Sequence, residues 1–372
     1  MSIPTSQSPD IIKTDIAIIG GGNAGITLAS KLKYQNALVF EPKTPEDRDV
    51  SWALWATGND QKDIASATRG RWKQWRLVDH NHEILHNSNE YYYTSLSSAD
   101  YLHYCEQQLS PNVGLVRETV ENIISHGSGG TFTASGQQYY ADHIFDSRPA
   151  KMDKAGLKQH FLGIEIRTKK PLKDIEIATL MDFRVDQSRG LHFIYALPFS
   201  DRSLLIESTM ISTTIEPVDW YKQAIYQWLD GQSIEIEEIT REELGIISMH
   251  ETTPKDTSLS RIGTSSGAIR LSSGYAFTHI QSQINQLASN IEKGDYRVPQ
   301  VISGTISTLD KIYNRVLVAE PSLGVTLMMK TAGALDAEGF SRFMLGKATI
   351  KDWIKVILAM PKLPFLTQVF RL

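Results

Sequence analysis

The feature that most constrains the fold is a glycine-rich turn between an apolar strand and a helix near residue 20. The expected strand covers Thr14–Ile19, and the run Gly20-Gly21-Gly22-Asn23-Ala24-Gly25 follows it directly. A helix to about Lys33 and a second strand over Ala37–Phe40 would complete a βαβ unit. This order is typical of a Rossmann-like nucleotide-binding domain. We therefore predict an α/β fold that begins with this unit.

Three glycines and one acidic residue in this unit would hold a dinucleotide. Gly20 permits the tight turn, Gly22 lets backbone amides approach a pyrophosphate, and Gly25 allows the helix and strand to pack closely. Glu41 follows the second strand and is placed to bind a ribose hydroxyl. The motif itself fits both FAD and NAD. Its position near the start of the chain, with a substrate-binding sheet to follow, favours FAD.

Composition excludes several other kinds of protein. The chain has 372 residues and a formal net charge of −4, so no overall positive field is available to hold nucleic acid. Cys105 is the only cysteine, which excludes an intramolecular disulfide and any multi-cysteine metal site. His80, His82 and His86 have no carboxylate or cysteine partner at a firm ligand spacing, so we predict no metal site.

No membrane-spanning segment is expected. Met1–Asp10 is a polar tail without the apolar core of a signal peptide. No window of the sequence reaches the roughly 18 uninterrupted apolar residues that a spanning helix needs.

The pattern changes to short, evenly spaced β segments after about residue 160. They cover Phe161–Arg167, Thr179–Gln187, His192–Leu197 and Leu204–Thr209, and the last two would form a hairpin. Helices are expected over Asp219–Leu229 and Tyr275–Lys293 and in the last 40 residues. We predict a nucleotide-binding part in 1–150, a mostly antiparallel β substrate domain in 151–260, a second nucleotide-binding part in 261–300 and a helical region in 301–372.

Several further motifs follow the first in a distinctive order. They are Val50-Ser51-Trp52-Ala53-Leu54-Trp55, Asp146-Ser147-Arg148-Pro149, Leu180–Gln187, Phe193–Phe199, Leu204–Thr209, Ile262–Gly267 and Ser273–Phe277. Together with Asp15–Gly25 they resemble the FAD-dependent lycopene cyclase family of bacteria and plants. The resemblance extends over about residues 14–295 and, more loosely, over the C-terminal helices.

The resemblance implies an enzyme of the bacterial lycopene β-cyclase type, which closes six-membered rings at the acyclic ends of lycopene; one or both ends could be cyclised. In that family the reaction begins with protonation of a terminal double bond, and the flavin must be reduced although no hydride is consumed. The implied cofactor is reduced FAD, with NAD(P)H as the reductant. The resemblance also places Arg148, Gly263 and Gly274 among the flavin-binding residues.

Glu207 is the candidate catalytic acid. It is the one acidic residue in the apolar run Ser203–Thr209. At a solvent-facing strand end it would be an ordinary surface carboxylate, whereas in an apolar pocket desolvation would raise its pKa and keep it protonated as a general acid. The resemblance favours the pocket. Plant members carry two adjacent acids at this point, whereas here Ser208 follows Glu207.

Aromatic side chains are expected around a cationic intermediate because their rings attract positive charge. Phe193 and Tyr195 fall on one face of the expected strand and Ile194 on the other. Core packing is the alternative role for such rings. We include Phe193 and Tyr195 among the predicted substrate-pocket residues.

An alternating run of charges precedes this strand. Asp182, Arg184 and Asp186 recur at a spacing of two, which would place them on one face of a strand. They either neutralise one another or hold the flavin or Glu207 in place. We include Asp182 in the predicted substrate pocket.

The C-terminal 26 residues combine an apolar stripe with positive charge. The stripe is formed by Ile350, Trp353, Ile354, Ile357 and Leu358, and the basic residues Lys347, Lys351, Lys355, Lys362 and Arg371 outweigh Asp352 to give a net charge of +4. Such a helix either packs on the protein core or lies on an anionic bilayer. Because a carotenoid dissolves in lipid, we expect a peripheral protein at the cytoplasmic face of a membrane.

Two other functions are compatible with a flavin fold. A FAD-dependent monooxygenase or reductase could act on an isoprenoid or aromatic substrate, but hydroxylases of this fold usually carry a Gly-Asp pair where this chain has Gly263-Thr264. A non-catalytic pigment or flavin carrier would have no use for a buried acid such as Glu207.

Overall fold

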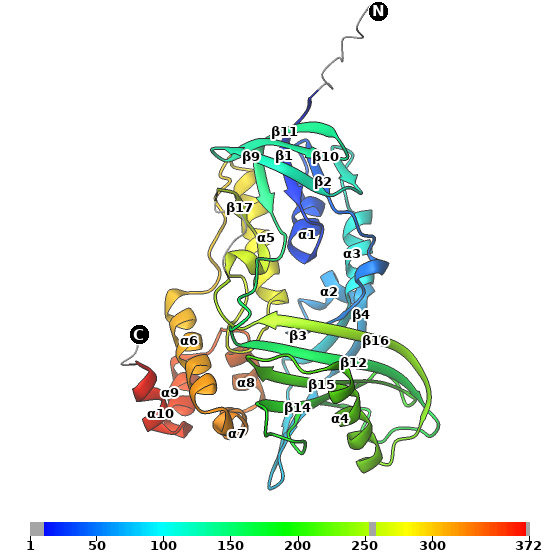
Figure 1. The fold of residues 1–372 in the computed structure, drawn as a ribbon, viewed down its shortest axis with the longest axis vertical. Helices are drawn as coiled ribbons and strands as arrows, with labels where there is room; N and C mark the ends of the chain where they lie inside the picture. Colours follow the sequence, from blue (N-terminus) through cyan, green and yellow to red (C-terminus); the bar gives the residue numbers. More distant parts are fainter. Residues whose placement is uncertain (1–10, 253–257, 370–372) are drawn as a thin grey trace, which may run out of the picture.

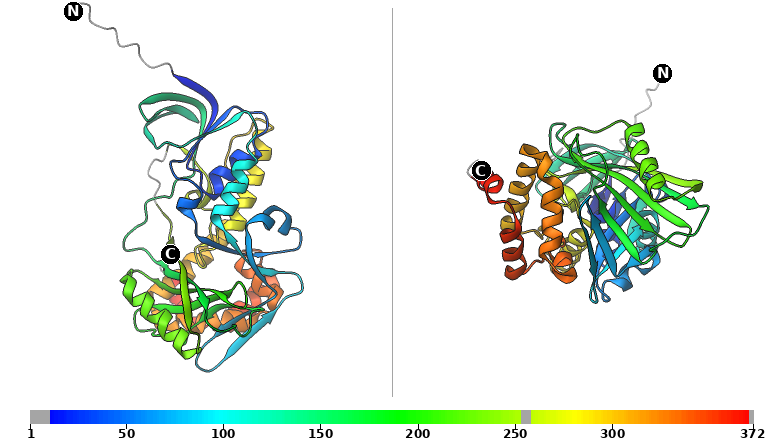
Figure 2. Two further views of the ribbon diagram at one scale, coloured as in Figure 1. Left: turned by 90° about the vertical axis from the view of Figure 1, so that its right-hand side faces the viewer. Right: turned by 90° about the horizontal axis from the view of Figure 1, so that it is seen from below.

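The computed structural model describes residues 11–252 and 258–369, which form three sheets with helices packed around them. The first sheet and its helices lie at one end of the molecule, and the second sheet and the C-terminal helices lie at the other (Figures 1 and 2). The predicted tail, Met1–Asp10, and Arg371 of the predicted basic stretch lie outside the described residues.

The predicted βαβ unit forms the centre of the first sheet. Strand β1 pairs in parallel with β2 and with β11, and β2 has the bounds that the sequence predicts. The strand order is β8-β2-β1-β11-β10-β9, with β17 also paired to β11. The strands are β1 (Ile12–Ile19), β2 (Ala37–Phe40), β8 (Val113–Val116), β9 (Val120–His126), β10 (Gly129–Ala134), β11 (Gln137–Asp146) and β17 (Ser260–Arg261).

Both faces of β1 are buried, which explains its run of isoleucines. Ile16 and Ile18 pack on one face in a cluster with residues of the helices α1, α3 and α5. Ala17 and Ile19 pack on the other face with residues of β9–β11. A strand covered on both sides has no polar face, so its sequence does not alternate. The three helices are α1 (Asn23–Lys31), α3 (Ser98–Gln107) and α5 (Phe277–Ile291).

The second sheet has the order β16-β12-β15-β14-β13-β5-β6 and is antiparallel except for the pairing of β13 with β5. The predicted hairpin is confirmed as β14 and β15. The predicted strand Thr179–Gln187 is too long, because β13 ends at Asp182. The strands are β5 (Gln74–Val78), β6 (Glu83–Asn87), β12 (Lys158–Thr168), β13 (Ile177–Asp182), β14 (Leu191–Pro198), β15 (Ser203–Ser212) and β16 (Ile236–Ser248).

The two faces of the second sheet have different neighbours. Helix α4 (Val218–Gly231) covers one face through Tyr221, Ile225 and Leu229. The other face packs against a third sheet and the C-terminal helices. The third sheet has the order β3-β7-β4, from β3 (Ser51–Ala56), β4 (Thr68–Trp72) and β7 (Tyr92–Ser97). The helices are α6 (Gly304–Ala319), α7 (Gly324–Ala334), α8 (Ala337–Met344), α9 (Ile350–Ala359) and α10 (Lys362–Val369).

Segments before residue 150 contribute to all three sheets. The strands β5 and β6 come from residues 74–87 and join the edge of the second sheet beside β13. Short helical turns complete the described chain: α2 (Gln61–Ile64) and the 3₁₀ turns η1 (Glu46–Arg48), η2 (Ala65–Ala67), η3 (Gly263–Ser266) and η4 (Pro321–Leu323). In the described part of the chain, no helix is both long enough and apolar enough to cross a bilayer.

Candidate functional site

The predicted nucleotide-binding residues meet at the carboxyl end of β1. Gly20 has a φ of +94°, which favours glycine. A Cβ on Gly25 would lie 1.9 Å from the carbonyl oxygen of Gly20, so helix and strand can approach only because this residue is glycine. Glu41 is buried beside the turn, and its Oε2 accepts a hydrogen bond of 2.9 Å from the amide of Gly21.

The start of α1 leaves room for an anion. The helix has no side-chain N-cap and no acidic residue in its first turn. A Cβ added to Gly22 would meet no described atom within 4 Å, so open space lies in front of the first amides. Free amides at a helix N-terminus are suited to bind phosphate. The residues present therefore fit a dinucleotide pyrophosphate.

Arg48 also belongs to this site, although no motif indicated it. Its Nη1 donates a hydrogen bond of 2.9 Å to the carbonyl oxygen of Gly21 and lies 3.3 Å from Oε2 of Glu41. It comes from the η1 turn that precedes β3. Arg48 therefore ties the glycine turn to the acid that would bind a ribose.

Two of the three residues placed here by the resemblance lie against the glycine turn. A Cβ on Gly20 would lie 3.3 Å from the amide nitrogen of Arg148, whose guanidinium pairs with Asp146 at 2.9 Å. Gly263 has a φ of +74°, and a Cβ on it would lie 2.8 Å from Cβ of Ala24. The second loop is therefore packed on the first turn of α1.

Gly274 has different neighbours. It also has a φ of +74°, but a Cβ there would meet Ile247 and Gln159 of the second sheet. The turn around Gly274 is closed by its amide, which donates to the carbonyl of Arg270 at 2.8 Å. This turn carries Tyr275 toward the second sheet.

Glu207 lies in the middle of the second sheet and is buried, with 8% of the residue exposed. It lies directly opposite Tyr195 of β14 on one side and Gly163 of β12 on the other. Burial raises the pKa of its carboxyl well above the ordinary value, and the charge of Glu243 raises it further. Burial therefore favours the protonated form, which is the form that a general acid needs.

Glu243 was not among the predicted residues. It lies on β16 opposite Gly163, so the two acids flank one glycine across three strands. Its Oε2 accepts a hydrogen bond of 3.0 Å from the amide of Ser51 and pairs with Arg241 at 3.0 Å. The sequence signal was poor because Glu243 belongs to a run of charged residues, Glu235–Glu243, that resembles a solvated strand.

Three tyrosines lie around Glu207. The hydroxyl of Tyr93 is 3.0 Å from that of Tyr195 and 3.2 Å from that of Tyr275. Burial raises the pKa of all three hydroxyls well above the ordinary value, and the charge of Glu207 would raise them further. Phe193 lies on the same face of β14 as Tyr195, and Ile194 lies on the other face. The prediction that Phe193 and Tyr195 share one face of the strand, with Ile194 on the other, is therefore confirmed.

The structure places Asp182 on the other side of the sheet from Glu207. Its carboxylate accepts hydrogen bonds from Arg184 at 2.6 Å and from Nε1 of Trp228 in α4 at 2.9 Å. Burial opposes its ionisation, but these hydrogen bonds outweigh burial and lower its pKa. Asp186 instead binds Ser188 beyond the end of β13. Asp182 therefore does not share a pocket with Glu207, and its charge is neutralised locally.

An apolar cavity of about 390 Å³ lies between the second sheet and the C-terminal helices. The sheet contributes Leu77, Met181 and Ile211, and the helices contribute Phe340, Trp353 and Phe365. Ile211 is on the same face of β15 as Glu207, about 13 Å along the strand. The cavity and the acid therefore share one face of the sheet.

The three histidines considered for metal binding, His80, His82 and His86, lie in different environments. His86 is buried, and its Nδ1 accepts a hydrogen bond of 3.0 Å from Nε1 of Trp75. His80 and His82 are exposed. Among the described residues, no group of three His, Cys, Asp or Glu side chains could hold a metal ion.

Comparison with known proteins agrees with this geometry. A lycopene beta-cyclase from Pantoea ananas is 22% identical over 376 residues, covering 95% of this chain and 96% of that protein. A geranylgeranyl bacteriochlorophyll reductase-like protein from Thermoplasma acidophilum has a TM-score of 0.66 at 11% identity, with 98% of this chain and 100% of that chain covered. A variant of halogenase PltM in complex with FAD has a TM-score of 0.56 at 11% identity, covering 95% and 87% of the two chains.

The solved structures show that the fold is the Rossmann-like fold of flavoproteins, with an inserted, mostly antiparallel sheet. The family described as lycopene cyclase protein matches residues 15–369, which include the glycine turn, the strand of Glu207 and the C-terminal helices. The chain therefore belongs to the lycopene cyclase family.

Proposed function

We propose that this chain is a FAD-dependent cyclase that forms β-ionone rings at the ends of lycopene without net oxidation or reduction. The observation that carries the proposal is the environment of Glu207, a buried acid with a raised pKa beside three tyrosines. Protonation of an alkene needs an acid that stays protonated and a site that excludes water. An apolar cavity on the same face of the sheet suits a hydrocarbon substrate.

The reaction balances without a redox step. Glu207 gives its proton to the terminal double bond, and the neighbouring carbon becomes positively charged. The π electrons of an internal double bond form the new ring bond and move the charge into the ring. Loss of a ring proton to a base then gives a product isomeric with the substrate. The rings of Tyr93, Tyr195 and Tyr275 would attract the cation through their quadrupoles.

The loop Gly20–Gly25, Glu41, Arg48 and the second loop at Gly263 would hold the cofactor. Reduced FAD, kept reduced by NAD(P)H, would supply electrostatic stabilisation of the cation. The chain's own residues would bind the pyrophosphate at the start of α1 and orient the ribose through Glu41.

Contact with a membrane surface is supported by the C-terminal helices. Ile350, Ile354, Ile357 and Leu358 are 80%, 51%, 53% and 71% exposed, so four of the five residues of the predicted apolar stripe face outward. The fifth, Trp353, packs against Phe343. Lys351 and Lys355 are exposed beside this stripe. Exposed apolar side chains next to lysines suit the surface of an anionic bilayer. We place the protein peripherally at the cytoplasmic face.

The test is pigment analysis of lycopene-accumulating bacterial cells that express the chain. Wild type should convert lycopene to monocyclic or bicyclic carotene, and Glu207→Gln should abolish the conversion. Glu242→Gln is the matched control, because Glu242 is the exposed neighbour of Glu243 and pairs with Lys222 at 2.8 Å.

Two outcomes would change the proposal. Cyclisation that survives in Glu207→Gln would mean that another group supplies the proton. Untouched lycopene in cells that contain yellow, FAD-loaded protein would favour the redox alternative, a monooxygenase or reductase of an isoprenoid or aromatic substrate.

A further inference from the structure

The strongest feature outside the predicted site is the contact between two buried acids. Glu207 and Glu243 are 8% and 6% exposed. Each lies opposite Gly163 in the strand register. A Cβ added to Gly163 would lie 3.0 Å from Cγ of both acids, so the missing side chain leaves the space in which the two carboxyl groups meet.

The hydrogen bonds of Glu243 leave one oxygen for Glu207. Its Oε2 is occupied by the amide of Ser51 and by Arg241. Its Oε1 is buried and has no donor among the described protein groups unless Glu207 carries a proton. A buried acceptor without a donor is costly, so the arrangement is satisfied when the Glu207 hydroxyl donates to this oxygen.

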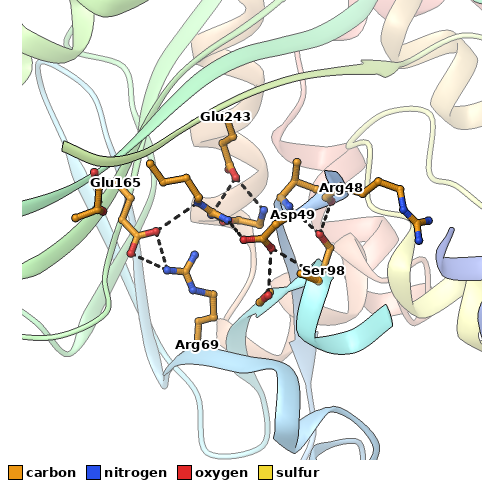
Figure 3. Close-up of polar contacts among 12 residues, drawn as sticks. Arg48, Asp49, Arg69, Ser98, Glu165 and Glu243 are labelled. Atoms are coloured by element: carbon orange, nitrogen blue, oxygen red, sulfur yellow. Dashed lines mark hydrogen bonds and ion pairs between the residues drawn. The ribbon is translucent and has the colours of Figure 1, made fainter. Parts of the chain in front are cut away.

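A charge network favours Glu243 as the ionised partner. Burial raises the pKa of Glu243 as well, but Arg241 and the amide of Ser51 oppose that rise, whereas the charge of Glu243 adds to the rise at Glu207. Figure 3 shows Glu243, Asp49 and Glu165 converging on one region, with Arg69 beside Glu165. Arg241 lies between the three acids, at 2.6 Å from Asp49, 3.6 Å from Glu165 and 3.0 Å from Glu243. Arg69 pairs with Glu165 at 2.7 Å.

This network contains three carboxylates, those of Asp49, Glu165 and Glu243, and two guanidinium groups, those of Arg69 and Arg241. Ionisation of Glu207 would add a fourth negative charge in a buried place. The other titratable groups that face Glu207 are the hydroxyls of Tyr93, Tyr195 and Tyr275, and these are neutral. No nearby group therefore favours the ionised form of Glu207 except Arg241, which Glu243 partly neutralises.

We propose that Glu243 is a positioning residue that holds Glu207 in its protonated form, by accepting a hydrogen bond from it and by keeping a fixed negative charge beside it. The inference rests on the proposed function for the use of that proton. Glu243 does not itself reach the substrate in this account. It sets the direction in which the Glu207 proton is held and the pH range over which the proton is present.

The test is an infrared titration of the purified, flavin-loaded full chain. The C=O stretch of a protonated carboxyl should persist to neutral pH in wild type and be absent in Glu207→Gln. In Glu243→Gln the fixed charge is replaced by an amide whose N–H can donate to the Glu207 carboxylate. The band should therefore disappear at a pH lower by about one unit or more. The alkaline limb of the cyclisation rate should move by the same amount.

Two further variants keep the test decisive. Glu242→Gln, on the exposed face of β16, should titrate as wild type does. Glu243→Asp keeps the charge and the position of Arg241 but withdraws the carboxylate by one methylene, so its band should disappear between wild type and Glu243→Gln. This variant serves if Glu243→Gln does not fold.

The outcomes separate the two proposals. An unchanged titration of the band in folded Glu243→Gln or Glu243→Asp would overturn the role of Glu243, whatever the substrate. A chain that shows the expected titration but leaves lycopene untouched would overturn the proposed function and leave the carboxyl pair standing.

Discussion

Glu207 and Ser208 are neighbours in the chain, but their side chains lie on opposite faces of the second sheet. Glu207 faces the tyrosines, whereas Oγ of Ser208 lies 2.9 Å from Nε2 of His192 on the face covered by α4. Adjacent residues of a strand point to opposite sides, so the position of Ser208 lies outside this pocket. The serine of this chain therefore leaves the surroundings of Glu207 unaltered.

Ser208→Ala should test this separation. We expect cyclisation within about twofold of wild type, because the changed atom is on the far face of the sheet. The free energy of unfolding should fall by about 1 kcal/mol, since His192 loses a buried hydrogen-bond partner. Pigment analysis and urea unfolding measure the two quantities. A large loss of cyclisation at unchanged stability would contradict the assigned faces.

Gly22→Ala should separate flavin binding from folding. Its Cβ would meet no described atom, and its φ of −68° and ψ of −172° suit alanine. The flavin-free protein should therefore unfold within about 0.5 kcal/mol of wild type. The methyl group would occupy the space for the pyrophosphate, so FAD affinity should fall at least about tenfold.

Gly25→Ala is the contrasting variant. Its Cβ would lie 1.9 Å from the carbonyl oxygen of Gly20, so the fold itself should be damaged. Flavin titration by fluorescence and thermal unfolding compare the two variants. Full FAD affinity in Gly22→Ala would place the pyrophosphate elsewhere.

Buried histidines should make the protein less stable in mild acid. Burial lowers the pKa of His160, His192 and His279 from 6.5 to about 4. Between these values the unfolded chain binds protons that the native protein does not, so stability falls as the pH drops from 6.5 toward 4. Each histidine can contribute up to about 1.4 kcal/mol per pH unit. Urea unfolding at pH 7, 6 and 5 measures the slope, and His192→Gln should reduce it.

Replacement of two apolar residues of α9 should weaken membrane binding. In Ile354→Glu combined with Leu358→Glu, two exposed side chains lose their affinity for lipid, so binding to anionic vesicles should weaken at least about tenfold. The melting temperature should not change, because neither side chain is buried. Ile124→Glu, at 58% exposure on β9, is the control for an added charge. Equal vesicle binding of the variant and wild type would exclude α9 as the contact.

The βαβ unit could be predicted because its signals are local. Glycines, an isoleucine run and Glu41 lie within about 30 residues and specify turn, strand and acid without reference to the rest of the chain. The single acid in an apolar run marked Glu207 as a candidate, but that pattern also fits a solvent-facing strand end, and only the family resemblance favoured a buried pocket. Its pocket depends on Tyr93 and Tyr275, which come from segments far away in the chain.

Asp182 and Glu243 could not be assigned from local pattern. The pairing of β13 with β14 shifts its register between Thr179 and Asp182, and a shift of one residue exchanges the two faces of a strand. Glu243 lies in a charged run with no apolar alternation, and its burial follows from the pairing of β16 with β12. In both cases long-range strand pairing decides the environment.

Gly163 takes no part in proton transfer, yet the meeting of the two acids depends on it. Gly163 lies on β12 between β15 and β16 and has no side chain. The side chains of Glu207 and Glu243 can therefore meet above it. A side chain there would crowd Cγ of both acids while leaving every ionisable group in the sequence unchanged. A search for catalytic residues confined to groups that can carry a proton would pass over the position on which the pair depends.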